Sequence, residues 1–494
     1  MRPGPRQVFA ASLGALFCAF CSAPRPGRDR LTVLLHDDVL TLNPNEQVEV
    51  VTDSVLANVY EPLVTLDENL VPRALLAESW EHPRPEQWRF HLRKGVRFHD
   101  GTLLTAAHVR DLLAATQKTA ELEASQFLSQ VREIGLVDEH TVDVITDKPR
   151  AILSDLPFLY IAKANTQATF PPFVGTGPFR VRDWIPGQRV VLERNAGYWG
   201  ARPVVREATF IPAPDPKTRL DKLRAGEADI ITGIPPEMAG TVPGVRFQRQ
   251  PGLSVFYLGY DVRNEPDNPL RDIRVRRAFH LAIDRRRMLD EVLKGNGSVP
   301  TQPVAPPVFG YNPALPPPVF DPDRARGLMA EAGHAKGFSL RLDYPLNHEI
   351  TAQILRQNLE AIGVRLEMNG MHRDSVYDFV KAGRSRFFFV GWDCATGVAS
   401  EFYEFCLHTP STSYGMFNYG HYSNLRVDLI AETNAAILDQ RKRQRLLQQA
   451  ATIVMDELPV LPLFVQDDLY GTRAEITFKP RADGRIPLLE IGFQ

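Results

Sequence analysis

The stretch from Tyr60 to Asp111 constrains the fold more than any other part of this 494-residue chain. Apolar and polar side chains alternate from Trp88 to Arg93, which predicts a strand with one buried face. Thr105 is suited to cap a following helix, because its hydroxyl can accept a backbone N–H. In order, the stretch predicts a helix end at Tyr60–Leu63, a turn at Ala77–Trp80, the strand, a turn at Phe98–Gly101 and the helix.

Composition narrows the class of protein. Hydrophobic residues make up 44% of the chain, enough to bury a large core in more than one folding unit. The 57 Lys and Arg residues nearly balance the 59 Asp and Glu residues, for a formal net charge of -2. A nucleic-acid-binding domain usually carries a basic stripe, so this balance argues against nucleic acid as a partner.

Strand-like and helix-like patterns alternate along the chain, which indicates an α/β class. Asp321 and Pro322 should cap and open one helix, and Gly333 should end it. A second helix should end at Gly363 and lead into a strand over Val364–Met368. The same reasoning predicts a hairpin of Phe179–Trp184 with Arg189–Arg194, a late helix over Leu446–Val454 and a buried strand over Val460–Val465.

Residues 1–23 form a predicted export signal. Arg2 and Arg6 precede an apolar run, Val8–Cys21, which is too short for a membrane-spanning helix. A buried N-terminal helix is the alternative. Cys18 and Cys21 lie where a lipoprotein cysteine would fall, so lipid anchoring and free periplasmic release both stay open. The mature protein is expected outside the cytoplasm.

Cys394 and Cys406 are the two cysteines that follow the export signal. Export to an oxidising compartment and an even number of cysteines favour a disulfide between them. Two buried thiols are the alternative interpretation.

Motifs for catalysis or metal binding are missing from the sequence. The twelve histidines are scattered, with no His-Glu-x-x-His motif. Gly175-Thr176-Gly177-Pro178 lacks the Lys-Ser/Thr of a phosphate-binding loop and is interpreted as a tight turn. Asp284 and Arg285 end a helix with a buried face over Val275–Ile283, and we interpret them as a helix-end ion pair. The sequence therefore predicts a protein that is not an enzyme and has no cofactor or metal.

Seven segments follow one another in an informative order: Tyr60–Asp111; Val174–Pro178; Leu192–Asn195 with Tyr198-Trp199; Leu223–Ile231; Asp272–Arg285; Tyr422–Asn424 with Val427-Asp428; and Pro459–Phe464. In this order they resemble the extracellular solute-binding proteins of family 5, the peptide- and nickel-binding components of ABC importers. The resemblance covers most of the mature chain.

The resemblance implies a bilobal α/β fold of the type II periplasmic-binding-protein class, with two hinge crossings. Lobe one would comprise residues 30–252 and 471–494, and lobe two residues 253–470. The resemblance also implies a monomer that binds a peptide-like solute in the cleft between the lobes and works with ABC permease subunits. An oligosaccharide or another polar metabolite is the second choice of ligand, and a secreted hydrolase that uses the cleft is the alternative from another class.

The predicted strand Phe387–Val390 leads to the region that should determine which ligand binds. Gly391-Trp392 should open a loop, and in peptide-binding relatives this loop carries an aspartate that pairs with the α-amino group of the ligand. Ala395 occupies that place here, and Val398 occupies a second acidic place. A buried ammonium without its carboxylate costs roughly 3–5 kcal/mol, so an ordinary free dipeptide is disfavoured unless another carboxylate substitutes.

Four residues are the candidates for ligand binding. Asp393 and Glu401 are the carboxylates that would substitute, although Asp393 would equally serve as a turn-capping loop residue. Trp392 would form a flat wall of the cleft, with a core position as the alternative. Asp261 stands where relatives often carry an asparagine near the hinge, and is a further polar contact.

Overall fold

The computed structural model describes residues 29–46, 49–164, 170–240, 242–412 and 414–494. The predicted export signal, with Cys18 and Cys21, lies outside these residues. Within the described ranges, no helix is both long and apolar enough to cross a membrane.

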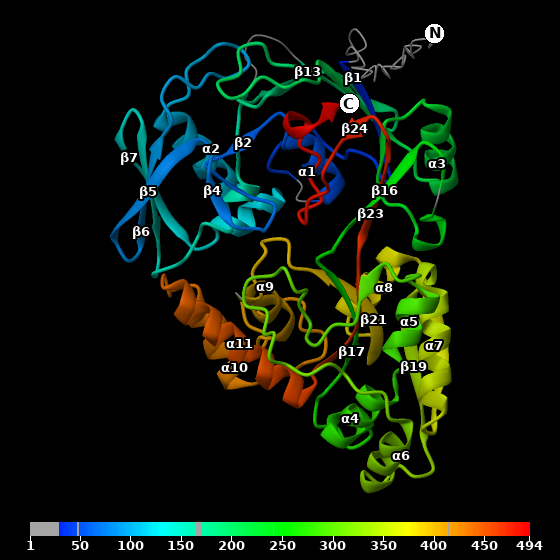
Figure 1. The fold of residues 1–494 in the computed structure, drawn as a ribbon. Coiled ribbons are helices and arrows are strands. Elements are labelled where there is room, and N and C mark those ends of the chain that lie inside the picture. The colour runs from blue at the N-terminus through cyan, green and yellow to red at the C-terminus, as the bar shows by residue number, and fades with distance from the viewer. Residues whose placement is uncertain (1–28, 47–48, 165–169, 241, 413) are drawn as a thin grey trace, which may run out of the picture.

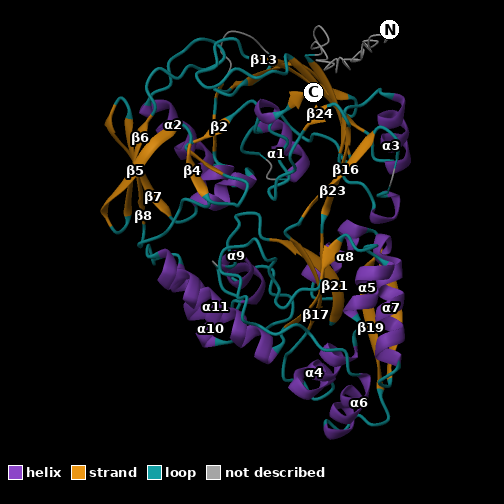
Figure 2. Ribbon diagram, in the orientation of Figure 1, coloured by secondary structure: helices purple, strands orange, loops and turns teal. Residues whose placement is uncertain are grey.

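Two large sheets organise the chain into two lobes, as Figures 1 and 2 show. Lobe one holds the first sheet and a smaller sheet beside it, and lobe two holds the second sheet. The first sheet has the order β12 (Phe179–Ile185), β13 (Arg189–Arg194), β14 (Glu207–Pro212), β1 (Arg30–Leu35), β15 (Ile230–Ile231), β23 (Asp468–Arg473), β16 (Val245–Gln250). The smaller sheet has the order β5 (Ala77–Arg84), β6 (Gln87–Leu92), β8 (Thr141–Thr146), β7 (Val131–Asp138). The second sheet has the order β18 (Gly297–Ser298), β22 (Val460–Gln466), β17 (Ser254–Tyr260), β21 (Phe387–Asp393), β19 (Phe338–Pro345), β20 (Val364–Met371).

Helices cover both faces of the second sheet. On one face, Phe279 and Leu355 pack with Phe389 of the sheet, and on the other face Val376 and Val427 pack in a separate core. The first face is covered by α4 (Ile273–Ala282), α5 (Arg285–Glu291), α6 (Pro322–Glu331) and α7 (Glu349–Glu360). The second face is covered by α8 (Arg373–Lys381), α9 (Ser400–Phe402), α10 (Leu425–Asn434) and α11 (Gln440–Glu457). Lobe one contains α1 (Val50–Leu56), α2 (Ala106–Lys118) and α3 (Pro216–Ala225).

The chain passes between the two large sheets at two neighbouring points. β16 is followed by β17, and β22 is followed by β23. Gly252 lies at this place, where a Cβ would stand 2.1 Å from the carbonyl oxygen of Gln466. The predicted boundary of lobe two lies at Tyr470, whereas Asp468 and Leu469 already pair with β16 of the first sheet. The change of sheet falls at Asp467, between the last residue of β22 and the first residue of β23.

Most of the local predictions are confirmed. β6 and the Thr105-capped α2 occur in the predicted order, and Gly101 forms the turn between them with φ +86. The predicted hairpin is β12 with β13. Asp321 caps α6 through the N–H of Arg324, and β20 follows Gly363. These elements were predictable because their signals are local.

Three local predictions are wrong. Ala77–Trp80 belongs to β5 instead of a turn. The helix before Tyr60 ends at Leu56, and β2 (Glu61–Pro62) pairs with β9 (Tyr160–Ile161). Asp284 does not form the predicted ion pair, because it caps α5 while the Arg285 guanidinium donates to the carbonyl oxygens of Pro462 and His280.

One buried carboxylate connects three of the seven ordered sequence segments: those that contain Glu61, Thr176, and Tyr198 with Trp199. Glu61 is 3% exposed and accepts hydrogen bonds from Thr176 Oγ1 at 2.8 Å, Tyr198 Oη at 2.8 Å and Trp199 Nε1 at 2.9 Å. Burial raises the pKa of Glu61 to about 7. Gly175 lies against the backbone before Tyr60, because a Cβ there would lie 2.1 Å from the carbonyl oxygen of Val59.

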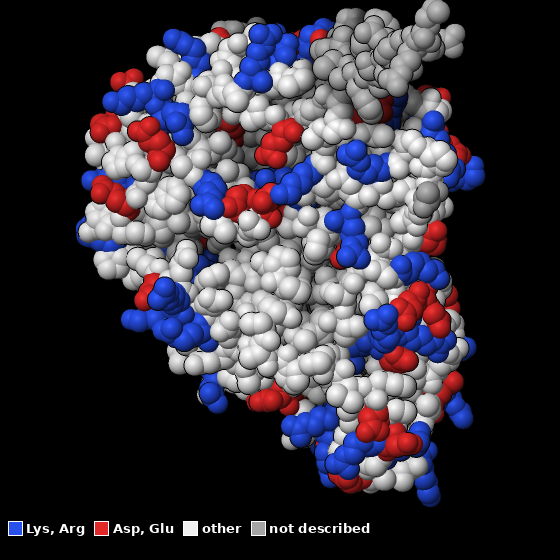
Figure 3. Space-filling view, viewed as in Figure 1, with Lys and Arg blue, Asp and Glu red and all other residues white. Residues whose placement is uncertain are grey.

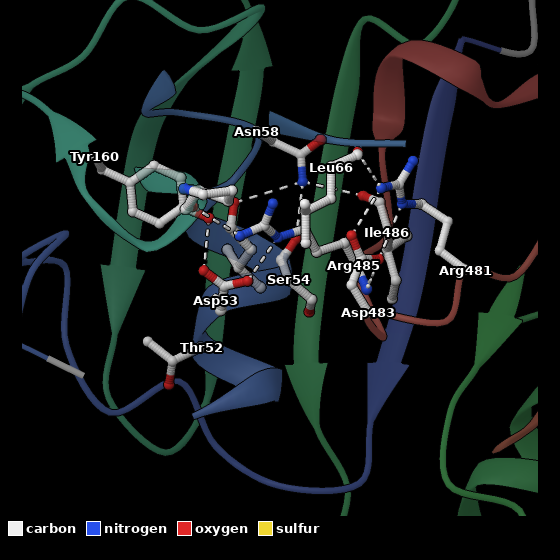
Figure 4. A network of polar contacts seen from close by, with 12 residues as sticks. Thr52, Asp53, Ser54, Asn58, Leu66, Tyr160, Arg481, Asp483, Arg485 and Ile486 are labelled. Atoms are coloured by element: carbon white, nitrogen blue, oxygen red, sulfur yellow. Dashed lines mark hydrogen bonds and ion pairs between the residues drawn. The ribbon is translucent and has the colours of Figure 1, made fainter. Parts of the chain in front are cut away.

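The C-terminal segment is tied into lobe one by a second network, shown in Figure 4. The Asp53 carboxylate accepts Tyr160 Oη at 2.5 Å and Arg485 Nε at 2.7 Å, and all three side chains are buried. Asn58 Nδ2 donates to the carbonyl oxygen of Ile486 at 3.0 Å. The chain that returns from lobe two therefore completes the core of lobe one.

Candidate ligand-binding cleft between the lobes

The hinge side of the lobe boundary carries two carboxylates. Asp393 is the last residue of β21, where it pairs with Ser254, the first residue of β17, and accepts a hydrogen bond from its Oγ. Asp468 opens β23 just after the second crossing. Burial, together with the charges of Asp393 and Asp467, raises the pKa of Asp468 to about 7. Asp393 and Asp468 therefore face one another closely enough to repel.

Protein atoms surround Asp393 although water reaches it. Its side chain is solvent-exposed, yet the loss of hydration among the surrounding atoms raises its pKa, against the opposing effects of Ser254 and Arg373. A group with this combination lies on the floor of a cleft, because a group on a convex surface would keep its hydration.

Glu401 adds a third carboxylate to the same region. It lies in α9 and accepts hydrogen bonds from Thr396 N at 3.0 Å and Thr396 Oγ1 at 2.7 Å. Burial raises its pKa to about 7, and the charge of Asp393 acts in the same direction. The structure thus brings together Asp393 and Glu401 from the sequence prediction, with Asp468 as an addition.

Trp392 lies on β21 rather than in the predicted loop, because the strand continues to Asp393. Its ring lies 5.3 Å from that of Phe417 and 6.3 Å from those of Phe402 and Phe405, centroid to centroid. The buried Nε1 has no acceptor within the part of the chain that the structure describes. Trp392 is therefore half-buried in an aromatic cluster beneath the acidic region.

Asp261 does not join this region. It follows β17 at the end away from Ser254, so about 20 Å of strand separates it from the crossings. Its carboxylate is 2% exposed and accepts Arg263 Nη2 at 2.6 Å and the Arg263 backbone N–H at 3.0 Å. The predicted position near the hinge is wrong, because the motif Tyr257–Tyr260 forms the far half of the strand.

Cys394 and Cys406 are free and buried in the structure, which differs from the disulfide that we favoured. Both belong to the apolar core under β21, together with Tyr257 and Phe402. Burial raises the pKa of both thiols, so neither is a reactive thiolate. They are packing residues of lobe two.

The lobes also meet on the side opposite the crossings. Ala151 N, in the loop after β8, donates to the carbonyl oxygen of Ala435 at 2.5 Å, and Figure 1 shows this loop reaching α11. Leu70 of lobe one packs against Gly397 of lobe two, where a Cβ would lie 2.9 Å from Leu70 Cβ. The cleft is thus bounded by the crossings at one end and by this contact at the other, an arrangement in which the lobes are closed.

Charges are distributed unevenly on the face drawn in Figure 3. The part of lobe two that adjoins the boundary shows a broad uncharged area, whereas lobe one carries Lys, Arg, Asp and Glu up to the boundary. No group of three or more His, Cys, Asp or Glu residues suited to a metal ion occurs among the described residues. The region is suited to hold a molecule by a few placed charges.

Together, the fold and the cleft define a bilobal binding protein of the type II class. A profile of the bacterial extracellular solute-binding proteins, family 5 Middle, matches residues 71–414. The chain therefore belongs to family 5 of the bacterial extracellular solute-binding proteins, which act outside the cytoplasm and deliver solutes to ABC permeases.

Individual proteins agree with this assignment. The chain is 28% identical over 480 residues to the glutathione-binding protein GsiB of Salmonella typhimurium, with 92% of each chain covered, and 27% identical over 479 residues to that of Escherichia coli K12, again with 92% of each covered. HbpA2 from Haemophilus parasuis superposes with a TM-score of 0.81 at 24% identity, covering 94% of this chain and 100% of that one. A dipeptide-binding protein from Pseudoalteromonas sp. SM9913 in complex with Met-Leu gives 0.77 at 19%, with the same coverage. These two superpositions show the shared fold.

Proposed function

We propose that this protein captures a peptide-like solute with a free amino group in the cleft between its lobes, outside the cytoplasm, and does not transform it. The observation that carries the proposal is the grouping of Asp393, Glu401 and Asp468 at the hinge side of the cleft. Similarity to glutathione-binding proteins over 92% of the chain supports the same ligand class. Lipid anchoring through Cys18 or Cys21, and action as a monomer, remain parts of this proposal.

The three carboxylates can take the place of the amine-pairing aspartate that is replaced by Ala395. Burial raises the pKa of all three, and the charge of Asp393 raises those of Glu401 and Asp468 as well, so the site is an unfavourable place for three negative charges. A bound ammonium relieves that repulsion and returns the carboxylates to their charged form. The missing aspartate of the peptide-binding pattern is thereby replaced from β21, α9 and β23.

Release and capture would proceed by rotation of the lobes about the two crossings near Gly252 and Asp467. The solute favours the closed state by no more than the difference between its affinities for the closed and open states. Trp392 would support the floor of the cleft from within its aromatic cluster, and a change there would act on the ligand through the position of Asp393.

A thermal-shift screen with glutathione, dipeptides, tripeptides, oligosaccharides and metal chelates tests the proposal. A ligand present at 100 times its Kd should add about 2.7 kcal/mol to the free energy of unfolding. We expect the peptides to stabilise the protein, and chromatography of the bound compound after prolonged incubation to recover it unchanged. Stabilisation by oligosaccharides alone, or turnover of the bound compound, would contradict the proposal.

Asp393→Asn should weaken the binding of a free-amine peptide by about 100-fold, because a charge-assisted contact to the ammonium is lost. The N-acetylated form of the same peptide should bind the wild-type protein weakly and the variant no worse. Asp323→Asn is the matched control, since Asp323 is an exposed acid on α6 at the far end of lobe two. Isothermal titration calorimetry measures the affinities. Equal losses for the free and acetylated peptides would remove Asp393 from amine recognition.

A further inference from the structure

The carboxyl ends of three strands lie at the edge of the second sheet that faces lobe one. β19 and β20 are parallel, with Pro345 opposite Met371, and β21 runs parallel to β19. Asp393 ends β21, and Arg373 follows β20 by two residues, as the first residue of α8. Ligands of α/β sheets bind at such carboxyl ends, so Arg373 occupies a position from which it can reach a solute.

A contact one turn along α8 shows which way Arg373 faces. Tyr377 Oη donates to the carbonyl oxygen of Gly391 at 3.3 Å and lies 3.4 Å from the Gly391 N–H. This face of α8 therefore packs on β21, two residues before Asp393. Residues four apart share a face of a helix, so Arg373 lies on the same face as Tyr377, nearer the end of β21.

The charge of Arg373 changes the pKa of groups in both lobes. It lowers the pKa of Asp393 in lobe two against the effect of burial. It also lowers the pKa of His36, which follows β1 in lobe one, together with burial and the charge of Arg219. A cation that changes the pKa of both Asp393 and His36 lies between the two lobes.

The guanidinium of Arg373 has no partner among the described residues, in either a hydrogen bond or an ion pair, and it is exposed. Arg219, the other cation beside His36, is 2% exposed and donates to the carbonyl oxygens of Ala213, Pro214 and Gly233. Arg219 thus serves the fold, whereas Arg373 is available. A free guanidinium is suited to bind a carboxylate through two parallel hydrogen bonds.

We propose that Arg373 binds the C-terminal carboxylate of the solute, in the same cleft as the amine-binding carboxylates. The site then selects a zwitterion, with its ammonium toward Asp393, Glu401 and Asp468 and its carboxylate toward α8. This assignment rests on the proposed function and specifies the second charged group of the ligand. An uncharged sugar would pair with neither the three carboxylates nor Arg373.

The test compares reduced glutathione with its glycine amide, which lacks the terminal carboxylate, on the wild-type protein and on Arg373→Met. The wild-type protein should bind the acid about 10- to 100-fold more tightly than the amide, which is the range expected for a charge-assisted contact. Arg373→Met should bind both with the weaker affinity. Its thermal unfolding without ligand should not change, because the side chain is exposed.

Arg365→Met is the matched control, because Arg365 is an exposed cation near the opposite end of β20 and should keep the discrimination. Equal binding of acid and amide by the wild-type protein, or discrimination that survives in Arg373→Met, would overturn the assignment while leaving peptide binding intact. If the wild-type protein binds neither glutathione nor any peptide of the screen, the proposed function itself fails, and the assignment with it.

Discussion

Glu61→Ala is expected to lower the free energy of unfolding by about 3–5 kcal/mol, a large part of the stability of a typical domain. The variant removes the acceptor shared by Thr176, Tyr198 and Trp199 and leaves three donors in the core of lobe one without a partner. Urea unfolding, followed by tryptophan fluorescence, measures the loss as a shift of the midpoint at unchanged slope. Trp199 donates directly to Glu61 and should report the change.

Glu61→Gln is the matched variant, because it keeps the shape and removes the charge. Its carbonyl oxygen can accept Thr176 and Trp199, and its amide can donate to Tyr198 Oη, which is able to accept. The variant should fold at neutral pH with nearly wild-type stability or better. An alanine variant as stable as the glutamine variant would show that the three donors find other acceptors.

The two variants also differ in their response to pH. Burial raises the pKa of Glu61 from 4.5 to about 7, so the native state binds more protons than the unfolded state between these values. Stability therefore falls as the pH rises through this window, by about 3 kcal/mol from this group, and levels off above about pH 8, where Glu61 is ionised in both states. Glu401 and Asp468 act in the same direction. The difference between wild-type and Glu61→Gln, measured from pH 4 to pH 8, isolates the part due to Glu61.

Local signals explain which parts of the fold could be predicted. Three elements have signals that span only a few residues, and the structure has all three: the alternation in β6, the Thr105 cap of α2 and the Asp321-Pro322 start of α6. The role of Glu61 could not be read in the same way, because its three donors lie between 115 and 138 residues away in the sequence. The ordered motifs were visible as a pattern, but their meeting point depends on the tertiary fold.

The candidate site divides in the same manner. Asp393 and Glu401 were found because they flank a place where a family pattern is broken. Asp468 and Arg373 had no such signal. Each is a charged residue beside the end of a strand, and only the tertiary fold brings those strand ends to the cleft. Gly391-Trp392 suggested a loop, yet pairing of Trp392 with Val255 and of Asp393 with Ser254 extends the strand. Cross-strand pairing of this kind has no local signature in the sequence.

The contact opposite the crossings places four charges between the lobes. Arg150 and Asp155 of lobe one form an ion pair at 3.5 Å, and Glu404 and Arg443 of lobe two face them. Burial raises the pKa of Asp155 and of Glu404, while Arg150 and Arg443 lower both. Each lobe contributes one positive and one negative charge, so each carboxylate has a second cation nearby only when the lobes are together. The cluster therefore favours the closed arrangement, in addition to the contact of Leu70 with Gly397.

Arg443→Met should shift the lobes toward an open arrangement, because Asp155 and Glu404 then share a single cation across the boundary. We expect a loss of about 2 kcal/mol for the closed state, which corresponds to roughly 30-fold faster release of a bound peptide. Small-angle scattering should show a larger radius of gyration without ligand, and stopped-flow fluorescence should measure the release. Arg441→Met removes the same charge from an exposed position on α11 and should change neither quantity. If both variants released the peptide at the wild-type rate, closure would depend on the apolar contacts and the crossings, and the four charges would contribute only to the packing of each lobe.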